Sequence, residues 1–173
     1  NLEEGIDLDD VKQMLTVFWE RNKNKIGNSR TEVELAVEIG GYKFFGKADR
    51  IDTLQDGSVE IIDYKTNKRD IGPDERAIQL GFYAIAARKL GMKVSKLTLD
   101  MLRLAKPVEM EVDENGNVSC GRMRGFSLED VENRLIEDCK AVANDYEHEF
   151  EVTDKDDNCR FCGYKFYCPK WVE

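Results

Sequence analysis

Two stretches of the sequence are the main guide to the fold: Gly46-Lys47-Ala48-Asp49-Arg50-Ile51-Asp52 and Ile61-Ile62-Asp63-Tyr64-Lys65-Thr66. Asp49 lies near the end of one predicted strand, and Asp63 and Lys65 lie two residues apart at the end of the next. Because side chains alternate between the two faces of a sheet, Asp63 and Lys65 leave the same face. An antiparallel meander brings the two strand ends together, so we expect Asp49 to lie close to Asp63.

These side chains fit two interpretations. Two neighbouring aspartates repel each other unless a cation neutralises them, and a hard cation such as Mg²⁺ prefers oxygen ligands. Asp49, Asp63 and the backbone carbonyl of Tyr64 would then hold the metal, and Lys65 would orient a water or stabilise charge on a phosphoryl oxygen. In the alternative interpretation, Asp63 and Lys65 form a surface ion pair and Asp49 is a turn residue. Spacing alone favours the two about equally.

The rest of the chain predicts helices before and after three paired strands. Apolar residues at helical spacing, strict alternation, and glycine or Asn-Gly turns mark the elements. We expect a helix from Asp7 to about Lys23; a three-stranded antiparallel meander from Glu32 to Tyr64; a helix from Pro73 to Gly91; a strand from Val94 to Leu104; a hairpin of Val108–Val112 and Val118–Met123; and a last helix that begins at Ser127. The apolar stripe of the first helix comprises Leu8, Val11, Leu15 and Phe18.

The composition predicts a folded domain rather than a charged tail. Apolar residues make up 41% of the 173 residues, and the 35% that are charged carry both signs. The net charge of −9 argues against a bulk electrostatic nucleic-acid binder, but not against an enzyme that meets phosphate through a carboxylate-held metal. No apolar run approaches the roughly 20 residues of a membrane helix. An odd number of cysteines without a secretory signal favours a reducing, cytoplasmic location.

The two opening stretches resemble the catalytic core of the PD-(D/E)XK nuclease superfamily, in particular its RecB/AddB-type exonuclease branch. That branch has a Gly-x-x-Asp-Arg-x-Asp strand, an Asp-Tyr-Lys-Thr strand and then a Gln-x-x-x-Tyr helix, which Gln79 and Tyr83 match here. The resemblance covers about Glu32 to Leu104 and implies an α/β fold with a mixed central sheet flanked by helices. It also implies that Asp49 and Asp63 bind Mg²⁺ or Mn²⁺ and that Lys65 is catalytic. Gln79 and Tyr83 would sit beside the active site and touch DNA or fix the core.

The implied activity is that of a metal-dependent deoxyribonuclease that hydrolyses phosphodiester bonds in DNA repair or recombination. Because the chain begins with Asn1 rather than Met, we expect the C-terminal nuclease module of a UvrD/Rep-like helicase, which would feed it single-stranded DNA. Three alternatives remain: a free-standing nuclease of the CRISPR-adaptation type, a catalytically retired module that binds DNA or scaffolds a helicase, and a metal-stapled interaction domain without a nucleic-acid role.

Two residues depart from the family pattern. The branch usually has a metal-binding histidine in an N-terminal helix, whereas the single histidine here, His148, lies near the end of the last helix. The family often has a catalytic glutamate in the strand before Asp49. Glu32 is the best candidate for that role, although a solvated strand face that it shares with Glu34 and Glu38 explains it about as well.

The cysteine-rich tail indicates a soft-metal site. Cys159, Cys162 and Cys168 have a C-x2-C-x5-C spacing that suits zinc or cluster iron. Similar nuclease tails hold a four-iron four-sulfur cluster, so we expect such a cluster first, completed by a residue outside this chain, then zinc, then an unmetallated tail. Arg160, Lys165 and Lys170, interleaved with aromatic residues, suit single-stranded nucleic acid. We therefore expect a nuclease domain at residues 1–150 and a cysteine-rich tail at 151–173.

Overall fold

The structure is a computed structural model that describes residues 7–25, 27–67, 72–104, 106–121, 123–147, 159–160 and 162–168, with the backbone alone at 123–124 and 145–147. The helices are α1 (Leu8–Asn22), α2 (Pro73–Lys89), α3 (Leu128–Glu147) and the short 3-10 helix η1 (Lys165–Tyr167). The strands are β1 (Ser29–Ile39), β2 (Tyr42–Thr53), β3 (Val59–Lys65), β4 (Val94–Met101), β5 (Val108–Val112), β6 (Asn117–Cys120) and β7 (Met123–Ser127). None of the described helices has the length and apolar composition that a membrane crossing requires.

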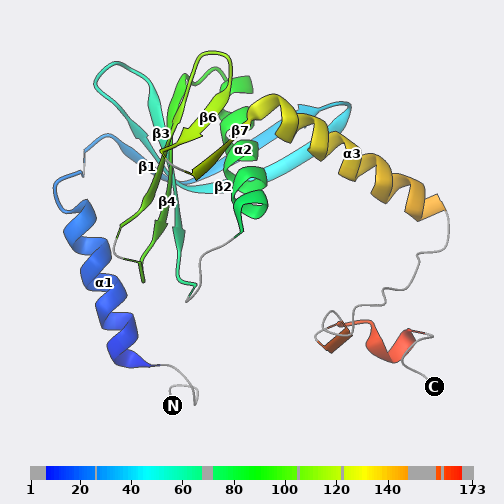
Figure 1. The fold of residues 1–173 in the computed structure, drawn as a ribbon, viewed down its shortest axis with the longest axis horizontal. Coiled ribbons are helices and arrows are strands. Elements are labelled where there is room, and N and C mark those ends of the chain that lie inside the picture. Colours follow the sequence, from blue (N-terminus) through cyan, green and yellow to red (C-terminus); the bar gives the residue numbers. More distant parts are fainter. Residues whose placement is uncertain are drawn as a thin grey trace. The chain divides into compact units, whose positions relative to one another are not determined.

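The strands form one seven-stranded sheet in the order β1-β2-β3-β4-β5-β6-β7 (Figure 1). Only β3 and β4 run parallel; the other neighbouring pairs are antiparallel. A parallel pair needs a crossover connection, and α2 supplies it between β3 and β4. The predicted fold class, an α/β fold with a mixed sheet flanked by helices, is confirmed, as is the antiparallel meander of β1, β2 and β3.

The two faces of the sheet differ in character. On one face, α2 buries leucine, isoleucine and alanine side chains against the central strands, and Leu80, Ile61 and Leu97 are fully buried there. On the other face, α1 meets the sheet through polar side chains: Arg21 pairs with Asp100, and Asn22 accepts from Arg50. The site described below lies on the α2 face, where β3 ends beside the inner part of β2.

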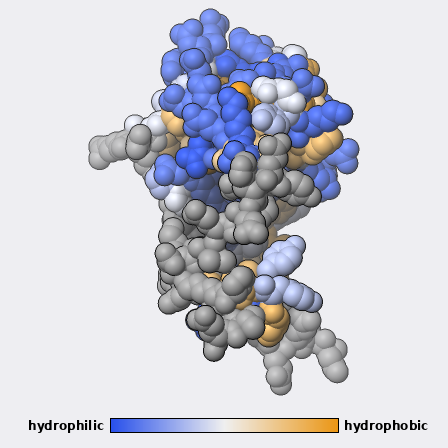
Figure 2. All heavy atoms as spheres, turned by 90° about the vertical axis from the view of Figure 1, so that its right-hand side faces the viewer, coloured by the Kyte–Doolittle hydropathy of each residue, from blue (hydrophilic) through white to orange (hydrophobic). Residues whose placement is uncertain are grey.

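Two units divide the chain, Asn1–Ile136 and Glu137–Glu173. The first contains the sheet, α1, α2 and the start of α3, whose Val131 packs against Gly81 of α2. The second contains the end of α3 and the described part of the tail. Among the coloured residues, the face drawn in Figure 2 is mostly hydrophilic, with hydrophobic residues in small patches, as the high charged fraction leads one to expect.

The apolar stripe of α1 is largely exposed: Leu8 is 48% and Leu15 is 62% exposed, while Phe18 packs against Tyr64 and polar contacts of Arg21 and Asn22 also hold the helix to the sheet. Two expectations about strand limits were wrong. The strand from Val94 ends at Met101 rather than Leu104, since the chain turns there with a bond from the Leu104 amide to the Met101 carbonyl. The expected strand Val118–Met123 is split into β6 and β7 around Gly121, whose φ of 53° lies in the left-handed region.

Candidate metal and catalytic site

Asp49 lies at the point where the pairing of β2 and β3 stops. The last paired residues are Arg50 and Ile62, and one step further the Asp49 carboxylate accepts the Tyr64 backbone N–H over 2.8 Å. A side chain thus takes the place of a backbone acceptor. The pairing of β1 with β2 also passes over this position, because it links Thr31 to Arg50 and Val33 to Ala48. Asp49 was predicted to lie close to the end of the next strand, and it does so through this bond, although it lies inside β2 rather than at its end.

Asp63 is the most deeply buried carboxylate in this region, with 2% of its surface exposed. Gln79 donates to its Oδ1 over 3.0 Å, and the Lys65 Nζ lies 2.9 Å from its Oδ2. Asp63 and Lys65 therefore share a face, as their spacing predicted. Burial raises the pKa of the Asp63 carboxyl; the Lys65 ammonium opposes this rise, and the negative charge of Asp49 adds to it.

The donor set fits a hard cation. The buried Asp63 Oδ2 lies 2.9 Å from the Lys65 ammonium, and the negative charge of Asp49 is close by. Two carboxylates beside one ammonium leave an excess of negative charge, which a cation at this point would offset. The amide and carbonyl of one strand residue point to the same edge, which turns the Tyr64 carbonyl toward the edge occupied by Asp49. These oxygens are the ligands that Mg²⁺ and Mn²⁺ prefer.

The helix α2 brings Gln79 and Tyr83 to the site, one helical turn apart. The Gln79 amide lies between the Asp63 carboxylate and the Tyr83 hydroxyl, which is 3.4 Å away. The close approach of α2 to β2 depends on Gly46, because a Cβ there would lie 2.4 Å from the Phe82 ring. The glycine of the Gly-x-x-Asp pattern thus has a steric reason: it allows the helix that carries Gln79 to pack on the strand that carries Asp49.

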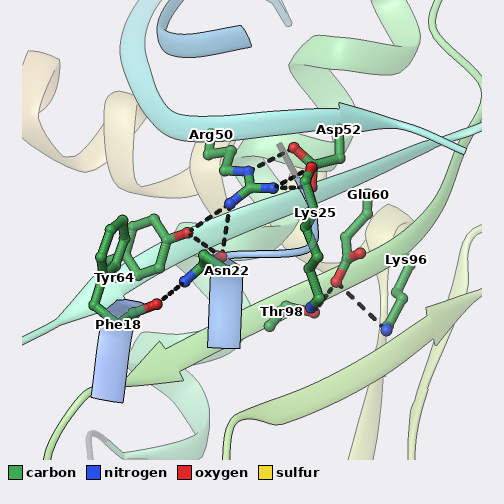
Figure 3. Close-up of polar contacts among 9 residues, drawn as sticks. All are labelled: Phe18, Asn22, Lys25, Arg50, Asp52, Glu60, Tyr64, Lys96 and Thr98. Atoms are coloured by element: carbon green, nitrogen blue, oxygen red, sulfur yellow. Dashed lines mark hydrogen bonds and ion pairs between the residues drawn. The ribbon is translucent and has the colours of Figure 1, made fainter. Parts of the chain in front are cut away.

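Behind the site, on the α1 face of the sheet, lies a group of polar residues that we call the Arg50 hub: Asn22, Arg50, Asp52 and Tyr64 (Figure 3). Arg50 donates to both oxygens of Asp52 over 2.6 Å and to the Asn22 carbonyl oxygen over 2.6 Å. The Tyr64 hydroxyl is within 3.3 Å of Arg50 and within 3.2 Å of Asn22. Burial lowers the pKa of Arg50, but its bonds to Asp52 and Tyr64 outweigh burial and raise it.

A second group on the same face, the Glu60 cluster, comprises Glu60, Lys96 and Thr98 (Figure 3). The Thr98 hydroxyl donates to the buried Glu60 carboxylate, and the Lys96 ammonium lies 3.4 Å from the same oxygen. Sequence reasoning missed both groups. The alternation of Arg50 with Ile51 and Asp52 could have signalled one polar face, but nothing in the sequence pointed to Asn22.

Glu32 lies on β1 and has a positive φ of 54°, the only described residue other than glycine that does. Its carboxylate pairs with the Lys47 ammonium, and both side chains are more than half exposed. Lys47 also lies within the field of Asp49, because both Glu32 and Asp49 raise its pKa, with the bond to Glu32 the largest cause. A catalytic role for Glu32 stays a prediction, and Lys47 is an additional cation at this edge of the site.

The tail is described in part. Its cysteines Cys159, Cys162 and Cys168 are free thiols in a series of turns, in which the Cys162 amide donates to the Cys159 carbonyl and the Cys168 amide to the Lys165 carbonyl. Among the residues that the structure describes, no group of three or more histidine, cysteine or acidic side chains is placed to hold a metal ion. His148 and Lys170 lie outside the described residues.

Comparison with known proteins supports this assignment of the fold. A family model described as the PD-(D/E)XK nuclease superfamily matches residues 5–169. A solved structure described as "Crystal structure of SSO0001" is similar, with a TM-score of 0.52 and 22% sequence identity over 92% of this chain and 68% of that chain. At that identity the likeness concerns the fold alone. No curated protein matches the chain.

Proposed function

Because the chain belongs to the PD-(D/E)XK nuclease superfamily, whose members are typically Mg²⁺- or Mn²⁺-dependent, we propose that it hydrolyses phosphodiester bonds in DNA at Asp49, Asp63 and Lys65. The observation that carries this proposal is the crowding of two carboxylates, Asp49 and the buried Asp63, beside the single ammonium of Lys65, at the end of β3. Elsewhere on β2 and β3, the buried Asp52 and Glu60 carboxylates have hydrogen-bonded partners.

In this proposal Asp49, Asp63 and the Tyr64 carbonyl hold the metal ion. The bound metal would activate a water molecule and stabilise charge on a phosphoryl oxygen. The Lys65 side chain is 20% exposed, so its ammonium is held by Asp63 but still reaches solvent. From there it orients the attacking water and stabilises negative charge that develops on the phosphate.

The neighbouring side chains have supporting roles. Gln79 holds one Asp63 oxygen, which leaves the other for the metal, and Tyr83 limits the movement of Gln79. Glu32 would act on the outer side of the site, where Lys47 could also meet a backbone phosphate. The nuclease part would comprise residues 1–150.

The finer assignment is to a RecB/AddB-type exonuclease module that acts on single-stranded DNA in repair, joined to or partnered by a helicase. What supports it is the motif order Gly46 to Asp52, Asp63 to Thr66 and Gln79 to Tyr83. For the tail, residues 151–173, we propose that Cys159, Cys162 and Cys168 ligate an iron–sulfur cluster or zinc together with a fourth ligand. The turns that bring Cys159 and Cys162 together support this part of the proposal.

The test is cleavage of end-labelled single-stranded DNA with Mn²⁺ or Mg²⁺, by the unaltered chain, Asp63→Asn and Lys65→Ala. We expect metal-dependent cleavage that falls at least about 1,000-fold in each variant, because charge stabilisation by several kcal/mol is lost. Lys96→Ala is the matched control: Lys96 also pairs with a buried carboxylate, but on the opposite face of the sheet, and cleavage should persist. Cleavage that survives Asp63→Asn would contradict the proposal.

A further inference from the structure

The two carboxylates of the site lie beyond the end of the backbone ladder that joins their strands. Pairing between β2 and β3 ends at Arg50 and Ile62, and beyond that pair the bond from the Tyr64 amide to the Asp49 carboxylate joins the two strands. The two charges also repel, because Asp49 contributes to the raised pKa of Asp63. A further contact between the two strands would therefore help to hold the two carboxylates at a fixed distance whenever no cation lies between them.

Such a contact exists on the opposite face of the sheet. The residue that follows Asp49 is Arg50, the residue that follows Asp63 is Tyr64, and the Arg50 guanidinium lies 3.3 Å from the Tyr64 hydroxyl. Each carboxylate is therefore directly bonded in sequence to a member of the Arg50 hub. The hub joins the two strands just where the ladder no longer does.

The helix α1 completes this connection. The Asn22 carbonyl oxygen accepts from Arg50 and from Tyr64, so it bridges β2 and β3, and its amide is anchored by the Phe18 carbonyl over 2.7 Å. The Phe18 ring packs edge-on against the Tyr64 ring, with 5.2 Å between centroids. Arg50 and Asn22 are both less than a tenth exposed, so water does not compete strongly for these bonds.

We infer that Asn22, Arg50 and Tyr64 are positioning residues that set the spacing of Asp49 and Asp63 for the metal ion, and that α1 thereby controls the metal affinity of a site to which it contributes no ligand. This inference rests on the proposed function. Displacement of α1 removes the contacts of Asn22 and Phe18 with Tyr64 and lets Asp49 and Asp63 move apart. The metal then binds more weakly, although every ligand remains.

A purely structural role for the hub predicts something different. In that case, any lost hydrogen bond of equal depth on this face would act alike, through the stability of the whole domain. The Glu60 cluster offers this comparison, because Thr98 lies on β4, donates one hydroxyl bond to a buried carboxylate and touches neither strand end. Tyr64→Phe and Thr98→Val each delete one hydroxyl group from the same face of the sheet.

The experiment measures Mn²⁺ binding to the full chain by calorimetry and by electron paramagnetic resonance, without DNA, and cleavage at saturating Mn²⁺. We expect Asn22→Ala to weaken Mn²⁺ binding about tenfold, as the loss of a hydrogen bond to a charged group predicts. Tyr64→Phe should weaken it by a smaller factor of about 3, because its two hydroxyl contacts are longer. Thr98→Val should bind Mn²⁺ as the unaltered chain does.

Each result bears on one of the two proposals. Unchanged Mn²⁺ affinity in Asn22→Ala and Tyr64→Phe, or an equal loss in Thr98→Val, would overturn the positioning role while the nuclease assignment stood. If Asn22→Ala fails to fold, Tyr64→Phe decides, because it keeps the aromatic ring against Phe18. Absence of Mn²⁺ binding by the unaltered chain would overturn both. Weakened binding with cleavage restored at saturating Mn²⁺ supports the inference, since it separates affinity from chemistry.

Discussion

The two faces of the sheet both carry buried charged side chains, but the partners of these side chains differ. On the α1 face, Arg50 is bonded to both oxygens of Asp52, and Glu60 accepts from Thr98 and lies near Lys96. On the α2 face, Asp63 is buried as deeply, but Lys65, 2.9 Å away, is its charged partner while a second carboxylate, Asp49, lies close by. Burial of charge is common to both faces. The quality of pairing separates a structural network from a functional site.

The same substitution on each face, aspartate to asparagine, tests most directly whether the two buried carboxylates differ in role. Asp52→Asn leaves the Arg50 guanidinium buried without its carboxylate, so we expect the free energy of unfolding to fall by about 3–5 kcal/mol. Asp63→Asn removes a carboxylate that burial already penalises, so the metal-free protein should lose little stability or gain some. Urea denaturation with a chelator present checks both.

Glu114→Gln, in the exposed turn between β5 and β6, controls for the loss of a carboxylate charge. If Asp63→Asn destabilised the protein as strongly as Asp52→Asn, both carboxylates would be structural. The distinction between the two faces would then be wrong.

A second prediction tests how tightly the α2 face is packed around the site. The Cβ of Gly46→Ala would meet the Phe82 ring, which is itself packed against Phe44 and Tyr83. Because a close-packed core yields little, we expect a loss of about 1–3 kcal/mol in the free energy of unfolding. Displacement of α2 should also lower cleavage, since Gln79 lies one turn from Tyr83.

Thermal and urea unfolding measure this loss, with Gly27→Ala as the matched control. No atom lies within 4 Å of a Cβ at Gly27, so that variant should be nearly neutral. Equal stability of the two variants would mean that the helix adjusts freely and that Gly46 has no steric role.

The smallest expected effect concerns pH. Burial raises the pKa of Asp63 in the folded, metal-free protein above its unfolded value, which is about 3.9. The folded state then holds the proton more tightly, so this group favours folding at low pH and that contribution is lost as pH rises through the folded pKa. Between about pH 4 and pH 7 the stability of the unaltered chain should therefore decline relative to Asp63→Asn. Urea midpoints of both proteins, measured with a chelator across this range, test the sign. If the unaltered chain became more stable relative to Asp63→Asn as pH rose, the prediction would be wrong.

Much of the site followed from local pattern. Alternation placed Asp63 and Lys65 on one face, and turn residues on either side of β2 predicted the meander that brings Asp49 to them. The spacing from Gln79 to Tyr83 predicted two side chains one turn apart on a single helix face. These features depend on a period of two or of about 3.6 residues, so neighbours along the chain determine them.

Other features depended on residues that are far apart in sequence. Asn22 reaches Arg50 only because α1 crosses the polar face of the sheet, and the apolar stripe of α1 does not indicate this contact. Glu60 meets Thr98 through the parallel pairing of β3 with β4, which the crossover of α2 determines.

The sequence by itself therefore determined the order of the elements, the shared face of Asp63 and Lys65, and the motifs that identify the superfamily. Only the tertiary structure decided which buried charges have partners, because a partner is supplied by another element at a distance and angle that no local period encodes. The pairing of Arg50 and the crowding of Asp49 and Asp63 beside one lysine are results of that packing, and they separate the support of the site from the site itself.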